Sequence, residues 1–162
     1  MRRVLLDTNV YGHIIKTTDK DWLIERVKNH TMLICGSSII RQELRDIPKN
    51  ATYKDIGVRN LCLEIYDGLV DEKRNYAVTE LVRSIAMEYS RIYKGFHSWR
   101  ELENDFLIVA SSSLHNIDIV VSNDERTMIS QIAMDAYRIV NRKFQLRSPN
   151  FINHGKFLDL LK

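Results

Sequence analysis

The sequence predicts an α/β fold, a three-layer α/β/α sandwich with a central, mainly parallel sheet. Short apolar runs of strand length occur at Arg3–Leu6, Met32–Cys35 and Ile117–Val121, and longer segments with helical spacing separate them. Short runs of this kind are typical of strands that are buried on both faces of a sheet. Strands that alternate with helices along a chain pair in parallel, and the helices cover both faces.

The length and composition are those of one soluble domain spanning residues 1–162. A chain of 162 residues can bury about two thirds of its unfolded surface. Its longest apolar runs are too short to span a bilayer, and the N-terminus has no signal-peptide core. We therefore expect a cytoplasmic protein with no membrane segment, in which Cys35 and Cys62 are buried reduced thiols. The net charge of +3 weakly favours an anionic partner.

Helical spacing and capping residues place the helices. Thr8 or Asn9 can cap a helix after the first strand, and Ser37 or Ser38 can cap one after the second. The pattern SWRE from Ser98 is a capping box. The expected helices begin at residue 8 or 9 and then cover about 21–29, 38–47, 53–69, 76–93, 98–115, 128–140 and a terminal segment from 148.

Two adjacent helical patterns, 53–69 and 76–93, predict a helical hairpin at about 53–93. A short strand at 68–70 can lie between these helices, and a last strand is predicted at 144–147. The hairpin is the expected place of substrate or partner specificity. Its apolar stripes fit core packing or a dimer face equally well.

Four carboxylates lie beside apolar runs: Asp7, Glu43, Asp105 and Asp124. Asp7 and Asp124 follow predicted strands, and sites in parallel sheets form outside the carboxyl ends of the strands. Glu43 and Asp105 can reach the same cleft from their helices. Acids gathered in this way repel one another unless a cation compensates their charge. The pattern therefore predicts a site for Mg²⁺ or Mn²⁺, which prefer oxygen ligands.

Two polar residues fit such a site. Asn9, two positions after Asp7, can hydrogen-bond a carboxylate and hold its rotamer. Ser122, two positions before Asp124, can hold a water molecule or contact a phosphate group. We expect both residues to support the acids.

Each acid taken alone also has a simple structural explanation. Asp7 can cap the helix that follows it, and Asp124 can form an Asx-turn. Glu43 and Asp105 can be exposed positions on amphipathic helices. The case for a site therefore depends on the order of the four acids along the chain.

That order resembles the PIN-domain family. The resemblance lies in DTNVYG after the first strand, in the helix opening from Ser38 to Glu43, in NDFLIVASS and in VVSND, and it extends over essentially the whole chain. It implies a Rossmann-like α/β/α sandwich and a Mg²⁺- or Mn²⁺-dependent ribonuclease site. Position by position, it implies a catalytic quartet made of Asp7, Glu43, Asp105 and Asp124. Three of these acids, Asp7, Asp105 and Asp124, would bind the metal ion. Asn9 and Ser122 would support them.

The resemblance also implies partners. Many single-domain members are VapC-like toxins of toxin–antitoxin modules and are often dimers. We therefore expect an endoribonuclease with an RNA substrate, an antitoxin protein as partner and a homodimeric assembly. Two alternatives stay open. The first is a non-catalytic PIN-like module that binds nucleic acid or a protein partner, and the second is a phosphatase or receiver-type acidic site, to which Asn9 and the lack of a paired acid are poorly suited.

Overall fold

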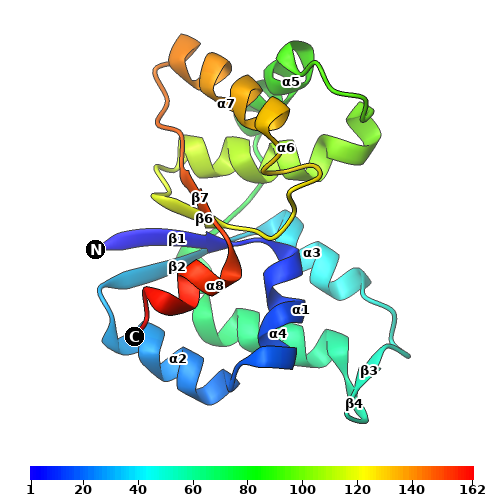
Figure 1. The fold of residues 1–162 in the computed structure, drawn as a ribbon, viewed down its shortest axis with the longest axis vertical. Helices are drawn as coiled ribbons and strands as arrows, with labels where there is room; N and C mark the ends of the chain where they lie inside the picture. Colours follow the sequence, from blue (N-terminus) through cyan, green and yellow to red (C-terminus); the bar gives the residue numbers. More distant parts are fainter.

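The computed structural model describes residues 1–162 and has one five-stranded, fully parallel sheet at its centre (Figure 1). The strand order across the sheet is β5-β2-β1-β6-β7. Apolar residues of neighbouring strands lie in register, as where Leu5 pairs with Cys35 on one side and with Val120 on the other. The strands are β1 (Arg2–Leu6), β2 (Met32–Ser37), β5 (Asn75–Tyr76), β6 (Ile119–Val121) and β7 (Asn150–Ile152).

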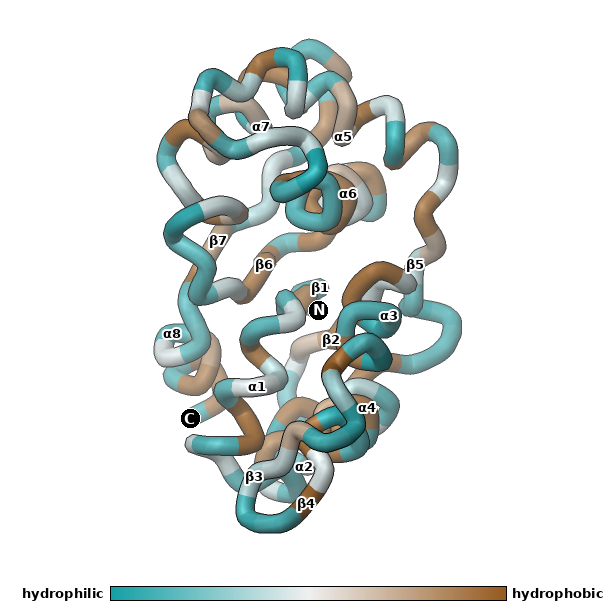
Figure 2. The backbone as a smooth tube through the Cα atoms, turned by 90° about the vertical axis from the view of Figure 1, so that its right-hand side faces the viewer, coloured by the Kyte–Doolittle hydropathy of each residue, from teal (hydrophilic) through white to brown (hydrophobic).

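Helices cover both faces of this sheet (Figures 1 and 2). The helices on one face are α1 (Thr8–Thr17), α2 (Lys20–Asn29), α3 (Ser38–Asp46), α4 (Val58–Leu69) and α8 (His154–Asp159). Those on the other face are α5 (Glu80–Ile92), α6 (Trp99–Leu114) and α7 (Gln131–Lys143). One cluster of 38 buried residues runs through all three layers. The predicted α/β/α sandwich is confirmed.

The order of the strands creates a switch point beside β1. The chain passes from β1 to β2 and then to β5 through helices on the first face. It then returns through α5 and α6, on the second face, to β6 on the opposite side of β1. Ligand sites of doubly wound sheets lie where the connections diverge in this way, at the carboxyl ends of the strands. In this chain that place lies between the ends of β1 and β6.

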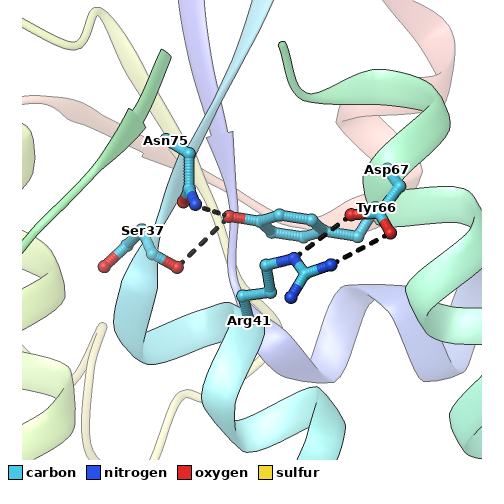
Figure 3. Close-up of polar contacts among 5 residues, drawn as sticks. All are labelled: Ser37, Arg41, Tyr66, Asp67 and Asn75. Atoms are coloured by element: carbon cyan, nitrogen blue, oxygen red, sulfur yellow. Dashed lines mark hydrogen bonds and ion pairs between the residues drawn. The ribbon is translucent and has the colours of Figure 1, made fainter. Parts of the chain in front are cut away.

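The carboxyl end of β2 packs tightly against Tyr66 of α4 (Figure 3). The Tyr66 hydroxyl lies 3.2 Å from the carbonyl oxygen of Ser37 and 2.8 Å from the side-chain oxygen of Asn75, and these two acceptors share its single hydrogen. A Cβ atom added at Gly36 would lie 2.0 Å from that hydroxyl oxygen. Position 36 therefore has to be glycine for Tyr66 to link α4 with β2 and β5.

An ion pair joins α4 to α3 beside this tyrosine (Figure 3). Arg41 of α3 donates two hydrogen bonds to Asp67 of α4, at 3.2 and 3.1 Å. Because α3 also carries Glu43, these contacts help to fix the helix from which that acid reaches the sheet edge.

The predicted helical hairpin at 53–93 is wrong, because α4 and α5 lie on opposite faces of the sheet (Figure 1). The segment between them contains a short 3₁₀ helix, Glu72–Arg74, and then β5, which pairs with the end of β2. The strand between the helices is therefore at 75–76 instead of 68–70.

The helix predicted from residue 53 begins only at Val58, because a two-stranded hairpin precedes it. Its strands are β3 (Thr52–Tyr53) and β4 (Ile56–Gly57). Lys54 and Asp55 form the turn with φ values of 48° and 63°. A two-residue turn with two positive φ angles matches the twist of an antiparallel pair, but it usually contains asparagine or glycine.

The strand predicted at 144–147 is also wrong, because α7 ends there in a Schellman motif. Gln145 has a φ of 56°, and the N–H of Leu146 donates to the carbonyl oxygen of Asn141 at 2.8 Å. Glycine usually occupies this position, so glutamine hides the motif in the sequence. The last strand is β7, and α8 begins at His154 instead of near 148.

The two cysteines lie where the sequence predicts. Cys35 and Cys62 are buried and unpaired. None of the helices combines the length and the apolar character that crossing a membrane would require.

Candidate active site

Asp7 lies at the switch point, directly after β1, and its side chain is buried, with 5% of the residue exposed. Three donors hold this carboxylate. The N–H of Thr8 donates to Oδ1 at 2.7 Å, the hydroxyl of Ser122 donates to Oδ2 at 2.8 Å, and the side-chain amide of Asn9 donates to Oδ2 as well. Asp7 is the N-cap of α1, as one of the simple explanations predicts, and it also faces the end of β6.

Ser122 and Asn9 connect Asp7 with the loop that follows β6. The amide of Asn9 donates to the hydroxyl oxygen of Ser122 at 3.2 Å. The same hydroxyl oxygen accepts the N–H of Asp124 at 3.0 Å. Both residues therefore contact the acids that they are expected to support.

Glu43 reaches the same edge from α3. Its Oε2 accepts a hydrogen bond from the hydroxyl of Thr8, the residue after Asp7. Its Oε1 accepts one from the side-chain amide of Asn104, at 2.7 Å, and Asn104 precedes Asp105 in α6. Glu43 is thus placed between the residues that adjoin two other acids of the quartet.

The two most enclosed acids have raised pKa values. Burial is the main reason that the pKa of Asp7 rises to about 7, and the charges of Asp105 and Glu43 raise it further, against hydrogen bonds from Ser122 and Thr8. Burial also raises the pKa of Asp105 to about 6, with added repulsion from Asp124 and Glu43. A nearby cation would lower both pKa values again.

The pKa of Asp124 is lowered instead, although this residue follows the neighbouring strand β6. Burial acts to raise its pKa, but hydrogen bonds from Thr127 and Arg126 outweigh that effect and hold the pKa below its usual value. Its Oδ1 accepts the N–H groups of Arg126 and Thr127, both at 3.0 Å, and its Oδ2 accepts the Thr127 hydroxyl at 2.7 Å. The turn that the sequence predicts as an alternative is therefore present.

Hydrogen bonds through Thr8, Asn104 and Ser122 bring the acids of the quartet to one edge of the sheet. Asp105 interacts electrostatically with each of the other three acids. As the side chains lie, no three acidic, histidine or cysteine side chains are arranged around one ion position. The donors fit a hard divalent cation in type, since all are carboxylate oxygens and two of them have pKa values that a cation would lower.

A groove of about 440 Å³ adjoins Glu43. Three of its nine lining residues are hydrophobic, and Arg83 is the one basic residue that lines it. The Arg83 side chain is 57% exposed and lies 3.8 Å from Glu103. The lining residues are Ser38, Ile39, Gln42, Glu43, Asp46, Ala77, Val78, Arg83 and Asn104.

The sequence pattern indicates Asn9 and Ser122 but not the other neutral partners of the acids. Thr8, Asn104 and Thr127 each donate to a quartet carboxylate, and Asn123 contacts Asn9. Three of them are adjacent in sequence to an acid or to Ser122. The contact of Thr127 with Asp124 could be expected only from the predicted Asx-turn at Asp124.

Comparisons with known proteins place this arrangement in a known fold. No protein-family model matches the sequence, and no curated protein matches it either. The structure of VapBC2 from Rickettsia felis, bound to a DNA fragment from its promoter, superposes with a TM-score of 0.53, 18% identity and coverage of 93% of this chain and 98% of that one. The fold is PIN-like.

Two further structures lead to the same conclusion. FitAcB from Neisseria gonorrhoeae has a TM-score of 0.56 and 16% identity, with coverage of 93% of this chain and 97% of that one. FitAB bound to an IR36 DNA fragment has the same TM-score and identity, with coverage of 93% and 94%. At such identities the likeness establishes the PIN-like fold that the sequence predicts and leaves the chemistry to the site itself.

Proposed function

We propose that this PIN-like protein is an endoribonuclease that depends on Mg²⁺ or Mn²⁺. The observation that carries the proposal is the meeting of four acids at the switch point, where Asp105 interacts with the other three. Structural ion-pair networks also perturb pKa values, but none of the four carboxylates forms a salt bridge with a lysine, arginine or histidine. Such a set of acids is costly to keep in a protein that does not bind a cation.

The acids divide into two roles in this proposal. Asp7, Asp105 and Asp124 would hold the cation, and Glu43 would complete the site or orient the attacking water. The bound cation would neutralise charge on a phosphoryl oxygen and lower the pKa of a water ligand. The water oxygen would attack phosphorus in line with the leaving oxygen, whose bond to phosphorus breaks.

Neutral residues would keep the acids in place during this reaction. Asn9 and Ser122 donate to Asp7, and Asn104 donates to Glu43. Partners of this kind orient ligands, and their loss typically reduces metal affinity or activity by about 10–100-fold. Arg83, in the adjoining groove, is suited to contact the phosphate backbone, which positions a strand without reading its sequence.

The proposed biological role is that of the toxin in a toxin–antitoxin module, with an antitoxin partner and a homodimeric assembly. The sequence resemblance to VapC-like toxins supports it, and so does the likeness to VapBC2 and FitAB over 93% of the chain. Expression of the chain alone should arrest growth, and co-expression of a small protein encoded beside it should relieve the arrest. Unaffected growth at high expression would contradict this role.

The nuclease is tested with a labelled single-stranded RNA in Mn²⁺, in Mg²⁺ and in chelator. The wild-type protein should cleave with either cation and stop in chelator. Asp7→Asn should reduce cleavage at least about 100-fold, because it removes one carboxylate from the cation site. Asp159→Asn is the matched control, since Asp159 is an exposed residue of α8 that pairs with Lys162. Cleavage by Asp7→Asn at the wild-type rate would sink the proposal.

A non-catalytic binding module is the second candidate. One observation favours it, namely that the carboxylates are already held by neutral donors and no three of them surround one ion position. RNA binding without cleavage in Mn²⁺, unchanged in Asp7→Asn, would support this alternative.

A further inference from the structure

Asn123, between Ser122 and Asp124, makes two hydrogen bonds that leave its own loop. Its backbone N–H donates to the side-chain oxygen of Asn9 at 3.2 Å. Its side-chain oxygen accepts the backbone N–H of His154 at 3.0 Å. It therefore connects the start of α1 with the start of α8 through the loop that follows β6.

The first of these bonds determines the orientation of the Asn9 amide. Because the oxygen of this amide faces the N–H of Asn123, its nitrogen faces Oδ2 of Asp7 and, at 3.2 Å, the hydroxyl oxygen of Ser122. A flipped amide would turn its nitrogen toward another donor and its oxygen toward the carboxylate of Asp7. Both contacts would then be unfavourable, so the N–H of Asn123 selects the orientation that serves Asp7.

The second bond holds Asn123 itself in place. The N–H of Ser122 donates to the carbonyl oxygen of Ile152 in β7 at 3.0 Å, so the loop and the last strand stay paired up to this point. Asn153 then caps α8, and His154 is buried with 7% of the residue exposed. The ring of His154 lies 6.0 Å from the ring of His13 in α1, the helix that also carries Asn9.

We infer that Asn123 is a positioning residue of the proposed nuclease, through which the β7–α8 junction orients Asn9 and thereby the carboxylate of Asp7. The inference rests on the proposed function. The β7–α8 junction, which is distant in sequence from the acidic quartet, thereby takes part in placing Asp7. His154 takes part through its backbone N–H, so this role does not depend on which side chain stands at position 154.

Two measurements test the inference. The first records the side-chain NH₂ signals of Asn9 by nuclear magnetic resonance, which requires no activity. Asn123→Ala should shift these signals and accelerate their exchange, because the loop loses its tether to His154. Asn123→Asp retains an oxygen that accepts this N–H and should keep the signals near their wild-type positions. Asn150→Ala, at an exposed position of β7, is the matched control and should change nothing.

The second measurement is a double-mutant cycle in the cleavage assay. Asn9→Ala and Asn123→Ala should each lower kcat about 10–100-fold with little change in KM for RNA. The double variant should be no slower than Asn9→Ala, because both changes remove the same contact to Asp7. Losses that multiply in the double variant would overturn the inference, as would unchanged Asn9 signals in Asn123→Ala.

The two measurements also separate this inference from the function on which it rests. If the wild-type protein fails to cleave RNA while Asn123→Ala still moves the Asn9 signals, the nuclease proposal fails and the link between Asn123 and Asn9 is supported.

Discussion

Asp7 and Asp124 follow two neighbouring parallel strands, but their surroundings give them opposite acidities. Asp7 is buried, has acidic neighbours and has a pKa of about 7. Asp124 is half-buried, accepts three hydrogen bonds within its own turn and has a lowered pKa. Two aspartates at the carboxyl ends of neighbouring strands thus differ in pKa through burial, local hydrogen-bond donors and neighbouring charges.

The comparison suggests a division of labour within the cation site. Asp124 is ionised at every pH near neutrality, so it would offer a fixed charge to an arriving cation. Asp7 and Asp105 hold protons more tightly and would release them as the cation binds. Metal binding should therefore be coupled to proton release mainly through the two enclosed acids.

The largest expected difference is in stability. In the absence of divalent cations at pH 7.5, Asp7→Asn should raise the free energy of unfolding by about 2 kcal/mol, because it removes a buried charge beside other acids. Asp124→Asn should lower the same free energy by about 1 kcal/mol, because the turn loses charge-assisted hydrogen bonds. Urea denaturation of both variants measures the two effects. If both variants changed the free energy of unfolding in the same direction, the proposed difference between Asp7 and Asp124 would be wrong.

The pH dependence of the Asp7 effect sharpens the comparison. At about pH 3 and below, this carboxyl is protonated in both the native and the unfolded state, so it contributes no difference. As the pH rises through about 4 toward 7, the unfolded state loses the proton first and the native state is destabilised. The advantage of Asp7→Asn should therefore be absent near pH 3, grow up to about pH 7 and stay constant above it. Denaturation curves at several pH values in chelator test this, and an advantage that is independent of pH would contradict it.

The smallest expected effect separates the local donors of the two acids. Thr127→Val removes the hydroxyl that donates to Asp124 and should destabilise the protein by about 1 kcal/mol. The effect should be greatest above pH 5 and be smaller in the Asp124→Asn background, where the bond to a charged acceptor is lost. Ser130→Ala is a suitable comparison, because it removes another hydroxyl of the same segment, the cap of α7, and its cost should persist in that background.

The sequence was sufficient to predict the three central strands, because each is a local apolar run with its own burial signal. It was insufficient for β5 and β7, which have two and three residues and are strands only because β2 and β6 lie beside them. The hairpin error has the same origin. The helical patterns of α4 and α5 were recognised, but nothing local reveals that the chain crosses the sheet between them.

The candidate site, like the fold, was predictable only where the signal is local in the sequence or follows from the order of the strands. The acids could be placed at one edge from their order along the chain and from the geometry of parallel sheets. Asn9 and Ser122 could be named as supporting residues because they lie close in sequence to Asp7 and Asp124. The partners of Glu43 could not, because Thr8 and Asn104 meet it only after α1, α3 and α6 have packed. The roles of the individual acids stay predictions until cleavage and cation binding are measured.

The contact between Gly36 and Tyr66 has a consequence for how this chain can be varied. The Tyr66 hydroxyl and Val70 together occupy the space that any side chain at position 36 would need. A library that randomises position 36 alone should therefore return glycine, whereas one that also admits smaller residues at positions 66 and 70 should recover new combinations. In such combinations α4 loses the hydrogen bond from Tyr66 to Ser37, and the ion pair between Arg41 and Asp67 remains to join α4 to the helix that presents Glu43.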